Sequence, residues 1–430
     1  MSSEVQKSTI AGEGFLSGPH QKRFAKIARR IFFALMKNQK RSSIGTLELK
    51  ERWGAHEKSF TFGAGELRAD MTITDPKAYS ALVFGGSRGL GRSYVNNLWS
   101  TDDIASLIRF LFRATQPLRS FLDGLANRFT VIFNLRHRRG PSKLKDRENI
   151  HAHYDLSNDF FELMLDDTMA YSCAIFKDET TTLFEAQTEK FDRLCRKLRL
   201  GPNDHVLEIG TGWGGFAIHA AKKYGARVTT TTISENQRQR AIERVAEAGV
   251  SHLVNVIGEH YADVRGTYDA LVSVEMIEAV DWRKYKEFFG DCSRLLTPQG
   301  RMAMQAITIA DQSFERAKHQ EDFIRDLIFP GGCLPSVAAI MDSVRLATDL
   351  KATGLEDIGI HYAKTLVEWR TAVNEKFDEI RKLGFDDRFL RLWNMYLGYC
   401  EGAFIERHIS VVQMVFEKPE APAFLTYPVN

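Results

Sequence analysis

Residues 206–224 carry the clearest hydrophobic pattern in the chain, and they predict a strand, a tight turn and a helix. The apolar run at 206–209 is typical of a buried strand in a parallel sheet. Glycines at 210, 212 and 214 follow this run and allow a turn in which the backbone can approach a ligand closely. Apolar residues then recur at helical spacing from Phe216 to Tyr224, with two lysines near the end.

Similar apolar runs predict four more strands, and helical patterns lie between them. These strands are expected near residues 227–232, 253–257, 268–274 and 300–307. Such an alternation of strands and helices predicts a doubly wound sheet. From residue 150 onward the predicted fold class is therefore α/β, with a Rossmann-like sheet.

The first part of the chain follows a different pattern, which predicts a smaller α+β domain. In chain order, the expected elements are a helix at 23–36, a hairpin of strands at 46–53 and 59–62, a strand at 71–74, a helix from Asp75-Pro76 to Phe84 and a helical stretch at 103–133. A length of 430 residues also exceeds one ordinary core. We predict an N-terminal domain over 1–135, a basic linker with Gly140-Pro141 over 136–149, and an α/β domain over 150–430.

The net charge is only +3, but basic residues gather in the first 150 positions, at 22–30, 37–41 and 136–145. Solvated surface is the simplest interpretation of any single cluster. Because phenylalanines and leucines lie among the clusters, their combination favours an anionic surface such as a phospholipid bilayer. Nucleic acid is the alternative acidic partner, but the chain contains no recognised nucleic-acid-binding motif.

Cysteine usage and apolar run lengths predict the compartment. No run approaches the roughly 18 apolar residues of a membrane-spanning helix, and the start of the chain lacks the pattern of a signal peptide. The five cysteines include no C-x-x-C pair, so neither a zinc site nor a disulfide framework is expected. These features predict a cytoplasmic protein without bound metal, which meets a membrane only at its inner face.

A second glycine-rich stretch, 83–91, looks like the cofactor loop of short-chain dehydrogenases. The segment before it follows helical spacing after a proline, whereas a cofactor loop follows a strand. No acidic residue at a second strand end comes about 20 residues later, and no Tyr-x-x-x-Lys pair follows. The dehydrogenase interpretation is therefore not favoured.

The glycine turn at 210–214 is more specific, because Glu208 precedes it within the strand. The spacing E-x-G-x-G-x-G is similar to that of S-adenosylmethionine-dependent methyltransferases. Open α/β sheets bind ligands at the carboxyl ends of their strands, where Glu208 is expected to lie. A carboxylate there suits a cationic amino-acid group better than a pyrophosphate.

Seven further motifs, in order, resemble the cyclopropane fatty acid synthases, which include the mycolic acid cyclopropane synthases. The motifs lie at 151–158, 168–174, 232–237, 273–278, 328–336, 361–366 and 399–404, and the resemblance covers 150 to about 417. The N-terminal part is similar to the small lipid-binding domain of that family. The resemblance implies a peripheral enzyme that acts on phospholipid acyl chains at the membrane.

The resemblance also implies an S-adenosylmethionine site. Its residues would be Tyr171, Ser172, Glu208, Gly210, Gly212, Gly214, Thr232, Ser234, Gln237, Glu259 and His260, with Tyr261 beside the adenine. The family more often has Asp-Tyr-Arg-Asp where this chain has His260 to Asp263. The adenine contacts are therefore the part of the site in which this chain departs from the family.

The reaction implied is methyl transfer to a cis double bond, which leaves a carbocation in the acyl chain. A base must then remove a proton from the new methyl group so that the cyclopropane ring closes. In the family this base is held to be a bicarbonate ion, whose ligands correspond to Cys173, Glu278, Gln305, Ile307 and Tyr362. Gln305 replaces the commonest histidine, and it cannot take up or release a proton.

Several alternatives stay open at the level of the sequence. Cys400 corresponds to a position counted with the family's active site, but helix packing explains it equally well. A hydride shift before proton loss would give a methyl- or methylene-branched chain. A lipid-binding protein with a relict cofactor fold, or a methyltransferase for small molecules or nucleic acids, are the remaining hypotheses. A homodimer is one assembly that the sequence allows.

Overall fold

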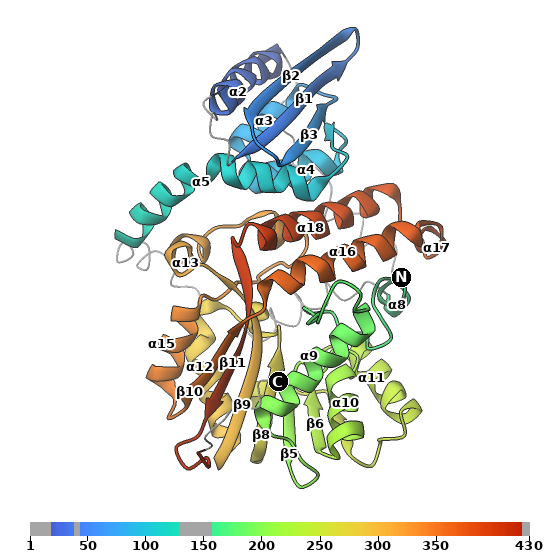
Figure 1. The fold of residues 1–430 in the computed structure, drawn as a ribbon, viewed down its shortest axis with the longest axis vertical. Helices are drawn as coiled ribbons and strands as arrows, with labels where there is room; N and C mark the ends of the chain where they lie inside the picture. The colour runs from blue at the N-terminus through green and yellow to red at the C-terminus, as the bar shows by residue number, and fades with distance from the viewer. Residues whose placement is uncertain (1–18, 38–43, 129–156, 424–430) are drawn as a thin grey trace. The chain divides into compact units, whose positions relative to one another are not determined.

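The computed structural model describes residues 19–37, 44–128 and 157–423 (Figure 1). The chain divides into two compact units, Met1–Ala114 and Thr115–Asn430. The predicted linker at 136–149 and the predicted boundary at 135 lie outside the described residues. So do residues 151–156 of the first motif and all of the basic stretch at 136–145.

The N-terminal unit contains a four-stranded sheet in the order β2-β1-β3-β4. As predicted, the first two strands form an antiparallel hairpin, whereas β3 pairs with β1 in parallel. Helix α2 buries Ala28, Phe32 and Met36 on one side. The elements of the unit are α2 (Pro19–Lys37), β1 (Gly45–Trp53), β2 (His56–Ala64), β3 (Arg68–Ile73), α3 (Lys77–Phe84), α4 (Gly86–Val95), β4 (Trp99–Ser100) and the start of α5 (Ile104–Arg128).

The glycine-rich stretch at 83–91 joins two helices, α3 and α4, and does not follow a strand. A Cβ atom on Gly89 would lie 2.0 Å from the carbonyl oxygen of Ala81, so glycine is required there for close helix packing. The rejection of the dehydrogenase loop is confirmed, because a helix supplies no strand end for a cofactor.

The second unit is built on a seven-stranded sheet in the order β10-β11-β9-β8-β5-β6-β7 (Figure 1). Its strands are β5 (His205–Ile209), β6 (Arg227–Thr231), β7 (Val254–Ile257), β8 (Tyr268–Val274), β9 (Leu296–Ile309), β10 (Lys351–Asp357) and β11 (Ile409–Glu417). The first five are parallel and confirm the predicted strands, whereas β11 runs antiparallel to both β9 and β10. Strands β10 and β11 are absent from the prediction.

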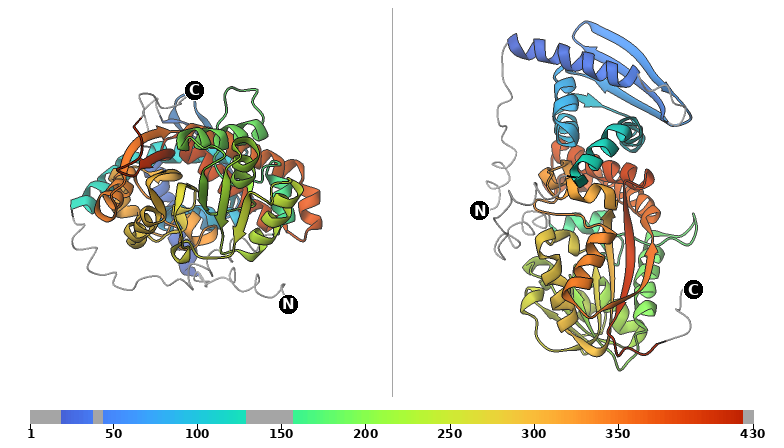
Figure 2. Two further views of the ribbon diagram at one scale, coloured as in Figure 1. Left: turned by 90° about the horizontal axis from the view of Figure 1, so that it is seen from below. Right: turned by 90° about the vertical axis from the view of Figure 1, so that its left-hand side faces the viewer.

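Helices cover both faces of this sheet, as Figure 2 shows in its right-hand view. On β5, Val206 packs into the core under α9 and α10, whereas Leu207 packs into the opposite core with α12 and α15. This alternation follows from the period of two along a strand. The helices of the unit are α8 (Asn158–Met164), α9 (Leu183–Leu198), α10 (Gly215–Tyr224), α11 (Glu235–Glu247), α12 (Tyr285–Arg294), α13 (Asp311–Ala317), α14 (Phe323–Leu327), α15 (Val337–Ala347), α16 (Gly359–Glu375), α17 (Phe377–Lys382) and α18 (Asp387–Ile405), with short helices η1 (Tyr261–Asp263), η2 (Ile277–Ala279) and η3 (Trp282–Lys284).

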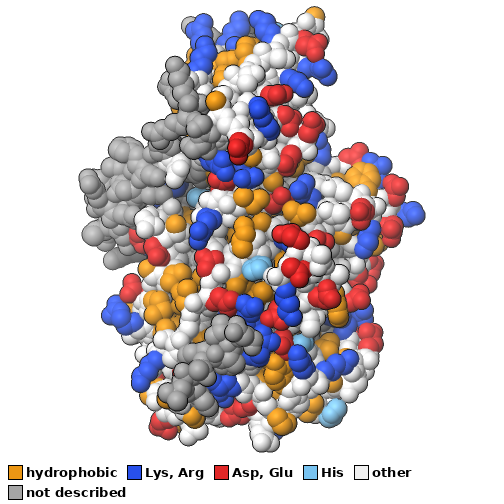
Figure 3. Space-filling view, in the orientation of Figure 1, with side chains coloured by type: hydrophobic (Ala, Val, Ile, Leu, Met, Phe, Trp, Pro, Cys, Tyr) orange, Lys and Arg blue, Asp and Glu red, His pale blue; other side chains and the backbone are white. Residues whose placement is uncertain are grey.

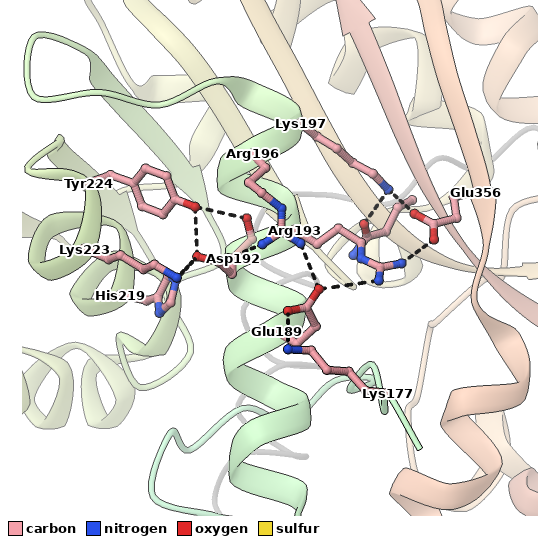
Figure 4. Close-up of polar contacts among 11 residues, drawn as sticks. Lys177, Glu189, Asp192, Arg193, Arg196, Lys197, His219, Lys223, Tyr224 and Glu356 are labelled. Carbon is pink, nitrogen blue, oxygen red and sulfur yellow. Dashed lines mark hydrogen bonds and ion pairs between the residues drawn. The ribbon is translucent and has the colours of Figure 1, made fainter. Parts of the chain in front are cut away.

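A network of charged side chains fixes α9 between α10 and β10 (Figure 4). On one side, buried Asp192 contacts Arg196 of the next turn, Lys223 at 2.6 Å and the Tyr224 hydroxyl at 2.8 Å. On the other side, Lys197 lies 2.5 Å from Glu356 of β10. Helix α9 is therefore tied to both of its neighbours by ion pairs.

Candidate active site

The site lies at the carboxyl ends of the neighbouring strands β5 and β8. After β5 the chain forms β6 and β7 on one side of β5, and it then returns to form β8 on the other side. Such a switch point leaves a crevice at the carboxyl ends of the strands. The turn after β5 contains Gly210 at φ 99° and Gly212 at φ 52°, both conformations that favour glycine. A Cβ atom on Gly212 would meet nothing within 4 Å, so this backbone is open to a ligand.

A pocket of about 1260 Å³, including its open mouth, occupies this crevice. Residues of the predicted S-adenosylmethionine site that line it are Tyr171, Ser172, Glu208, Gly210, Gly212, Thr232, Gln237, Glu259 and His260. Tyr261 lines it too. Gly214 and Ser234 do not line it, because they start helices α10 and α11, and the Ser234 hydroxyl accepts from the Gln237 backbone N–H.

Glu208 is the buried acid of the pocket. It is 3% exposed, and its Oε2 accepts a hydrogen bond of 2.6 Å from the Thr230 hydroxyl. Burial raises the pKa of Glu208 to about 8, while the Thr230 hydrogen bond and the charge of Lys190 oppose this shift. The carboxyl group is therefore mostly neutral at pH 7 until a cation comes beside it.

Lys190 of α9 binds the pocket-lining segment at Ser172. This lysine is not among the residues predicted for the site. Its side chain is fully buried, and Nζ donates to the Ser172 hydroxyl at 2.6 Å and lies 4.3 Å from the Phe191 ring centroid. Gln187, one turn earlier, donates to the Ser172 carbonyl at 2.8 Å. Burial lowers the pKa of Lys190 to about 8. In the sequence, the polar residues Gln187 and Lys190 on the apolar face of this predicted helix were the signal that could have indicated their role.

Three of the residues predicted to bind bicarbonate donate hydrogen bonds to one carboxylate, that of Glu275. Glu275, directly after β8, accepts the Cys173 backbone N–H at 2.9 Å and the Gln305 amide at 2.7 Å on Oε1. The Tyr362 hydroxyl donates to its Oε2 at 2.8 Å. Glu275 is absent from the predicted site, although an acid at a strand's carboxyl end was a usable signal. The structure thus brings together residues from four separate segments.

Glu278, from the same motif, stands beside this carboxylate. Its Oε1 accepts the Ile307 backbone N–H, and its buried Oε2 has no hydrogen-bond partner among the described residues. Burial raises the pKa of Glu278 to about 8, and the negative charge of Glu275 adds to the shift. Glu278 is therefore mostly protonated at pH 7.

The direction of the Gln305 amide is set by its neighbours. Gln413, opposite Gln305 in the β11–β9 pairing, donates from Nε2 to the Gln305 oxygen at 2.9 Å. Lys197 in turn donates to the Gln413 oxygen at 2.7 Å. Gln305 Nε2 is left to donate to Glu275 and, at 3.1 Å, to the Cys173 carbonyl. Both amide hydrogens of Gln305 are thereby used.

The glycine turn and the buried acid of β5 agree with the family resemblance of the sequence. The family model described as mycolic acid cyclopropane synthetase matches residues 141–414. The chain belongs to this family. It is an S-adenosylmethionine-dependent methyltransferase, and the glycine turn and the neutral Glu208 fit that cofactor, because they offer open backbone and a partner for its ammonium group.

The relatives of this chain within the family are named for different products. The chain is 38% identical over 371 residues to the tuberculostearic acid methyltransferase UfaA1 of Mycobacterium tuberculosis, covering 84% of this chain and 86% of that one. It is 34% identical over 357 residues to the cyclopropane-fatty-acyl-phospholipid synthase of Escherichia coli, covering 82% and 89%. The crystal structure of the mycolic acid cyclopropane synthase CmaA1 with SAH and CTAB matches with a TM-score of 0.60 and 32% identity, over 66% of this chain and all of that one.

The two cysteines predicted for the active site of this family member are both thiols. Cys173 is fully buried, and its Sγ points to the carbonyl oxygen of Ala174 at 3.3 Å. Burial and the charge of Glu275 raise its pKa well above 9, so Cys173 serves the cluster through its backbone N–H. Cys400 lies on α18 and does not line the pocket, and burial raises its pKa also.

Within the described part of the chain, no three His, Cys, Asp or Glu side chains lie close enough to hold a metal ion. No helix in the same part of the chain is both long and apolar enough to cross a bilayer.

Proposed function

We propose that this methyltransferase transfers the methyl group of S-adenosylmethionine to the cis double bond of an unsaturated phospholipid acyl chain, and that a cyclopropane ring then closes. One observation carries the proposal: Glu275 and the cofactor residues Glu208 and Gly210 line the same pocket. An acid–base group therefore meets the place where the methyl group would be delivered.

The chemistry requires a strong electrophile and a site without water. An alkene is a weak nucleophile, and the sulfonium methyl group of the cofactor is reactive enough to be attacked. The carbocation that results must be kept from water. Aromatic side chains supply both shelter and a negative face for a cation, and Tyr171, Trp213 and Tyr261 line the pocket. Tyr171 is held in place by a 2.9 Å contact between its hydroxyl and that of Tyr396.

The second candidate is a methyl- or methylene-branched product from the same first step. It is favoured by the similarity to a tuberculostearic acid methyltransferase, which is not named for a cyclopropane product. In this route a hydride moves to the cation before the proton is lost. The ring closes when the first cation loses a proton directly, whereas the branched product forms when a hydride shift comes before the proton loss.

We also propose that the N-terminal unit binds the lipid surface through α2. Next to the buried stripe of this helix lies an exposed apolar stripe formed by Phe24, Ile27, Ile31 and Leu35, 37–55% exposed. Lys26, Arg30 and Lys37 lie on the same helix. Figure 3 shows basic and hydrophobic side chains gathered over the end of this unit. An exposed apolar stripe with flanking cations is the composition of an interfacial helix that binds anionic lipid.

The reaction is tested by expressing the protein in a bacterium that makes monounsaturated fatty acids but no cyclopropane or branched ones. Mass spectrometry of the fatty acid esters should show a gain of one methylene on monounsaturated chains. Chemical derivatisation then separates a ring from an exocyclic methylene group. Unchanged fatty acids, with the cofactor bound in calorimetry, would contradict the lipid substrate, and absence of cofactor binding would favour a lipid-binding protein instead.

A further inference from the structure

We propose that Glu275 is the base that removes the proton from the substrate cation, in place of a bound bicarbonate ion. This inference rests on the proposed function, because it assigns a residue to the last step of that reaction. It differs from the family-based expectation, in which Cys173, Gln305 and Tyr362 hold an external anion.

Glu275 is placed at the pocket, unlike the residues that donate to it. Glu275 lines the cofactor pocket together with Tyr171 and Ser172. Cys173, Gln305 and Tyr362 are buried behind it and do not line the pocket. Glu275 is thus the member of this cluster that lines the cofactor pocket, whereas the donors to its carboxylate come from residues outside the lining.

The side-chain and backbone donors of Cys173, Gln305 and Tyr362, which were expected to bind bicarbonate, already donate to acceptors of the protein. The Cys173 N–H, the Tyr362 hydroxyl and one Gln305 amide hydrogen go to Glu275, and the other amide hydrogen goes to the Cys173 carbonyl. An external anion would have to displace the Glu275 carboxylate from all of them. It would also add a negative charge beside two buried carboxyl groups, which is unfavourable.

The backbone of Glu275 is in a strained conformation. Glu275 has φ 49°, in the left-handed region that favours glycine. Non-glycine residues persist in this region mainly where the surrounding structure fixes them, and such positions concentrate at functional sites. Here the surrounding structure is the set of donors to the carboxylate, so the strain and the hydrogen bonds belong to one arrangement.

The charges around Glu275 keep it available as a base. Lys190 of α9 supplies a buried positive charge nearby, and the Gln305, Cys173 and Tyr362 donors stabilise the ionised form against burial, which raises the pKa of Glu275. Glu278 has fewer donors and takes the proton of the pair. Two neighbouring carboxyl groups with different surroundings divide into one base and one neutral acid.

The proposed reaction moves electrons between the alkene, the cofactor and Glu275. The alkene π electrons form a bond to the methyl carbon, the carbon–sulfur bond breaks with its pair on sulfur, and a cation forms on the other alkene carbon. Glu275 then takes a proton from the transferred methyl group, and the C–H electrons form the last bond of the ring. If a hydride shifts first, loss of the same proton gives an exocyclic methylene. Glu275 lines the pocket from which the methyl carbon is delivered, so this carboxylate stands in the same pocket as the carbon that loses the proton.

The experiment is chemical rescue in a Glu275→Gly variant, which removes the carboxylate and also relieves the positive φ. In buffer freed of carbonate, we expect product formation to fall by about 100-fold or more. Added bicarbonate or formate should then raise product formation by the variant at least about tenfold. The native protein should show no response to bicarbonate. Arg407→Gly is the control, because Arg407 is exposed, also has positive φ (52°) and lies outside the pocket lining; it should keep its activity and show no response.

Two results would overturn the proposal: a native enzyme that needs bicarbonate, or a Glu275→Gly variant that is fully active without added anion. Calorimetry of cofactor binding shows whether the variant folds. If it does not, Glu275→Gln tests the same point, since it keeps the shape without the base; it should be inactive and not rescued, and full activity would overturn the proposal. A native protein without product under any condition would instead contradict the proposed function.

Discussion

Three buried carboxyl groups of the second unit are treated differently by their surroundings. Glu208 has one hydroxyl donor, Glu278 has one backbone donor, and Glu275 has three donors with Lys190 nearby. Burial alone would keep all three neutral. The number of donors therefore decides which one carries charge, and it separates a binding residue, a base and a neutral partner.

At this scale, Glu208 predicts a pH dependence of cofactor binding. Its pKa is raised to about 8, so the free protein holds a proton there at pH 6 to 7.5, whereas the cofactor's ammonium group would favour the ionised form. Affinity should rise by about tenfold between pH 6 and pH 7.5, with release of a proton. Calorimetry in buffers of different ionisation enthalpy measures both. Glu208→Gln should bind more weakly and without this dependence, and a proton taken up on binding would contradict the assignment.

Individual elements carry functions that their composition alone does not reveal. Helix α9 presents Lys190 and Gln187 to the pocket segment while its charged residues tie it to α10 and β10 (Figure 4). Helix α2 buries one apolar stripe and exposes another beside it. In both helices two neighbouring faces lie in different surroundings, which a single hydrophobic periodicity does not separate.

Asp192 should be important for the position of α9. Asp192→Asn removes a buried charge that contacts Arg196 and Lys223, and leaves those cations with a weaker partner. We expect a loss of about 2 kcal/mol in the free energy of unfolding, measured by urea titration. Asp342→Asn is the matched control, because Asp342 pairs with Arg345 on the surface with both side chains exposed; its effect should stay within about 0.5 kcal/mol. Equal effects of the two substitutions would show that the α9 network is not stabilising.

The exposed stripe of α2 gives a second prediction for an element. The double substitution Phe24→Asp and Ile27→Asp should abolish sedimentation with anionic phospholipid vesicles and lower product formation on them, since both apolar area and net positive charge are lost. Cofactor binding should not change. Leu346→Asp on α15, where Leu346 is 53% exposed, is the control and should sediment normally. Undiminished vesicle binding by the double variant would exclude α2 as the docking surface.

At the scale of the whole molecule, the enzyme keeps uncompensated acids inside its catalytic unit, and stability should reflect this. The pKa values of Glu208 and Glu278 are about 8 in the fold, against an ordinary value of 4.5. A carboxyl group whose pKa is raised by folding contributes stability below about pH 4.5, and this contribution is lost as the pH rises through about 8.

The cofactor-free protein should therefore be more stable at pH 6 than at pH 8.5, by about 1–3 kcal/mol in the free energy of unfolding. Urea titrations at the two pH values measure the difference, and S-adenosylmethionine should reduce it by supplying a cation to Glu208. Glu208→Gln should also reduce it. Stability that increases toward pH 8.5 would contradict the assignment of neutral carboxyl groups.

The order of residues along the chain was sufficient to predict the parallel strands, the glycine turn, the family and ten of the residues that line the pocket. These features are local, because a buried strand, a turn with positive φ and a helix each follow from residues within a few positions of one another. Strands β10 and β11 escaped prediction, since β11 joins the sheet only by pairing with β9, about 100 positions away, and β10 joins it only by pairing with β11. The predicted linker and domain boundary stay predictions.

The hydrogen bonds around Glu275 form only in the assembled fold. Glu275 stands three residues from Glu278 in one motif, yet its role depends on donors from residues 173, 305 and 362. The direction of the Gln305 amide depends on Gln413 of β11, a strand that the sequence pattern did not predict. Hydrogen-bond partners that are distant in sequence meet only when the sheet is assembled, and a buried carboxylate takes its charge from those partners.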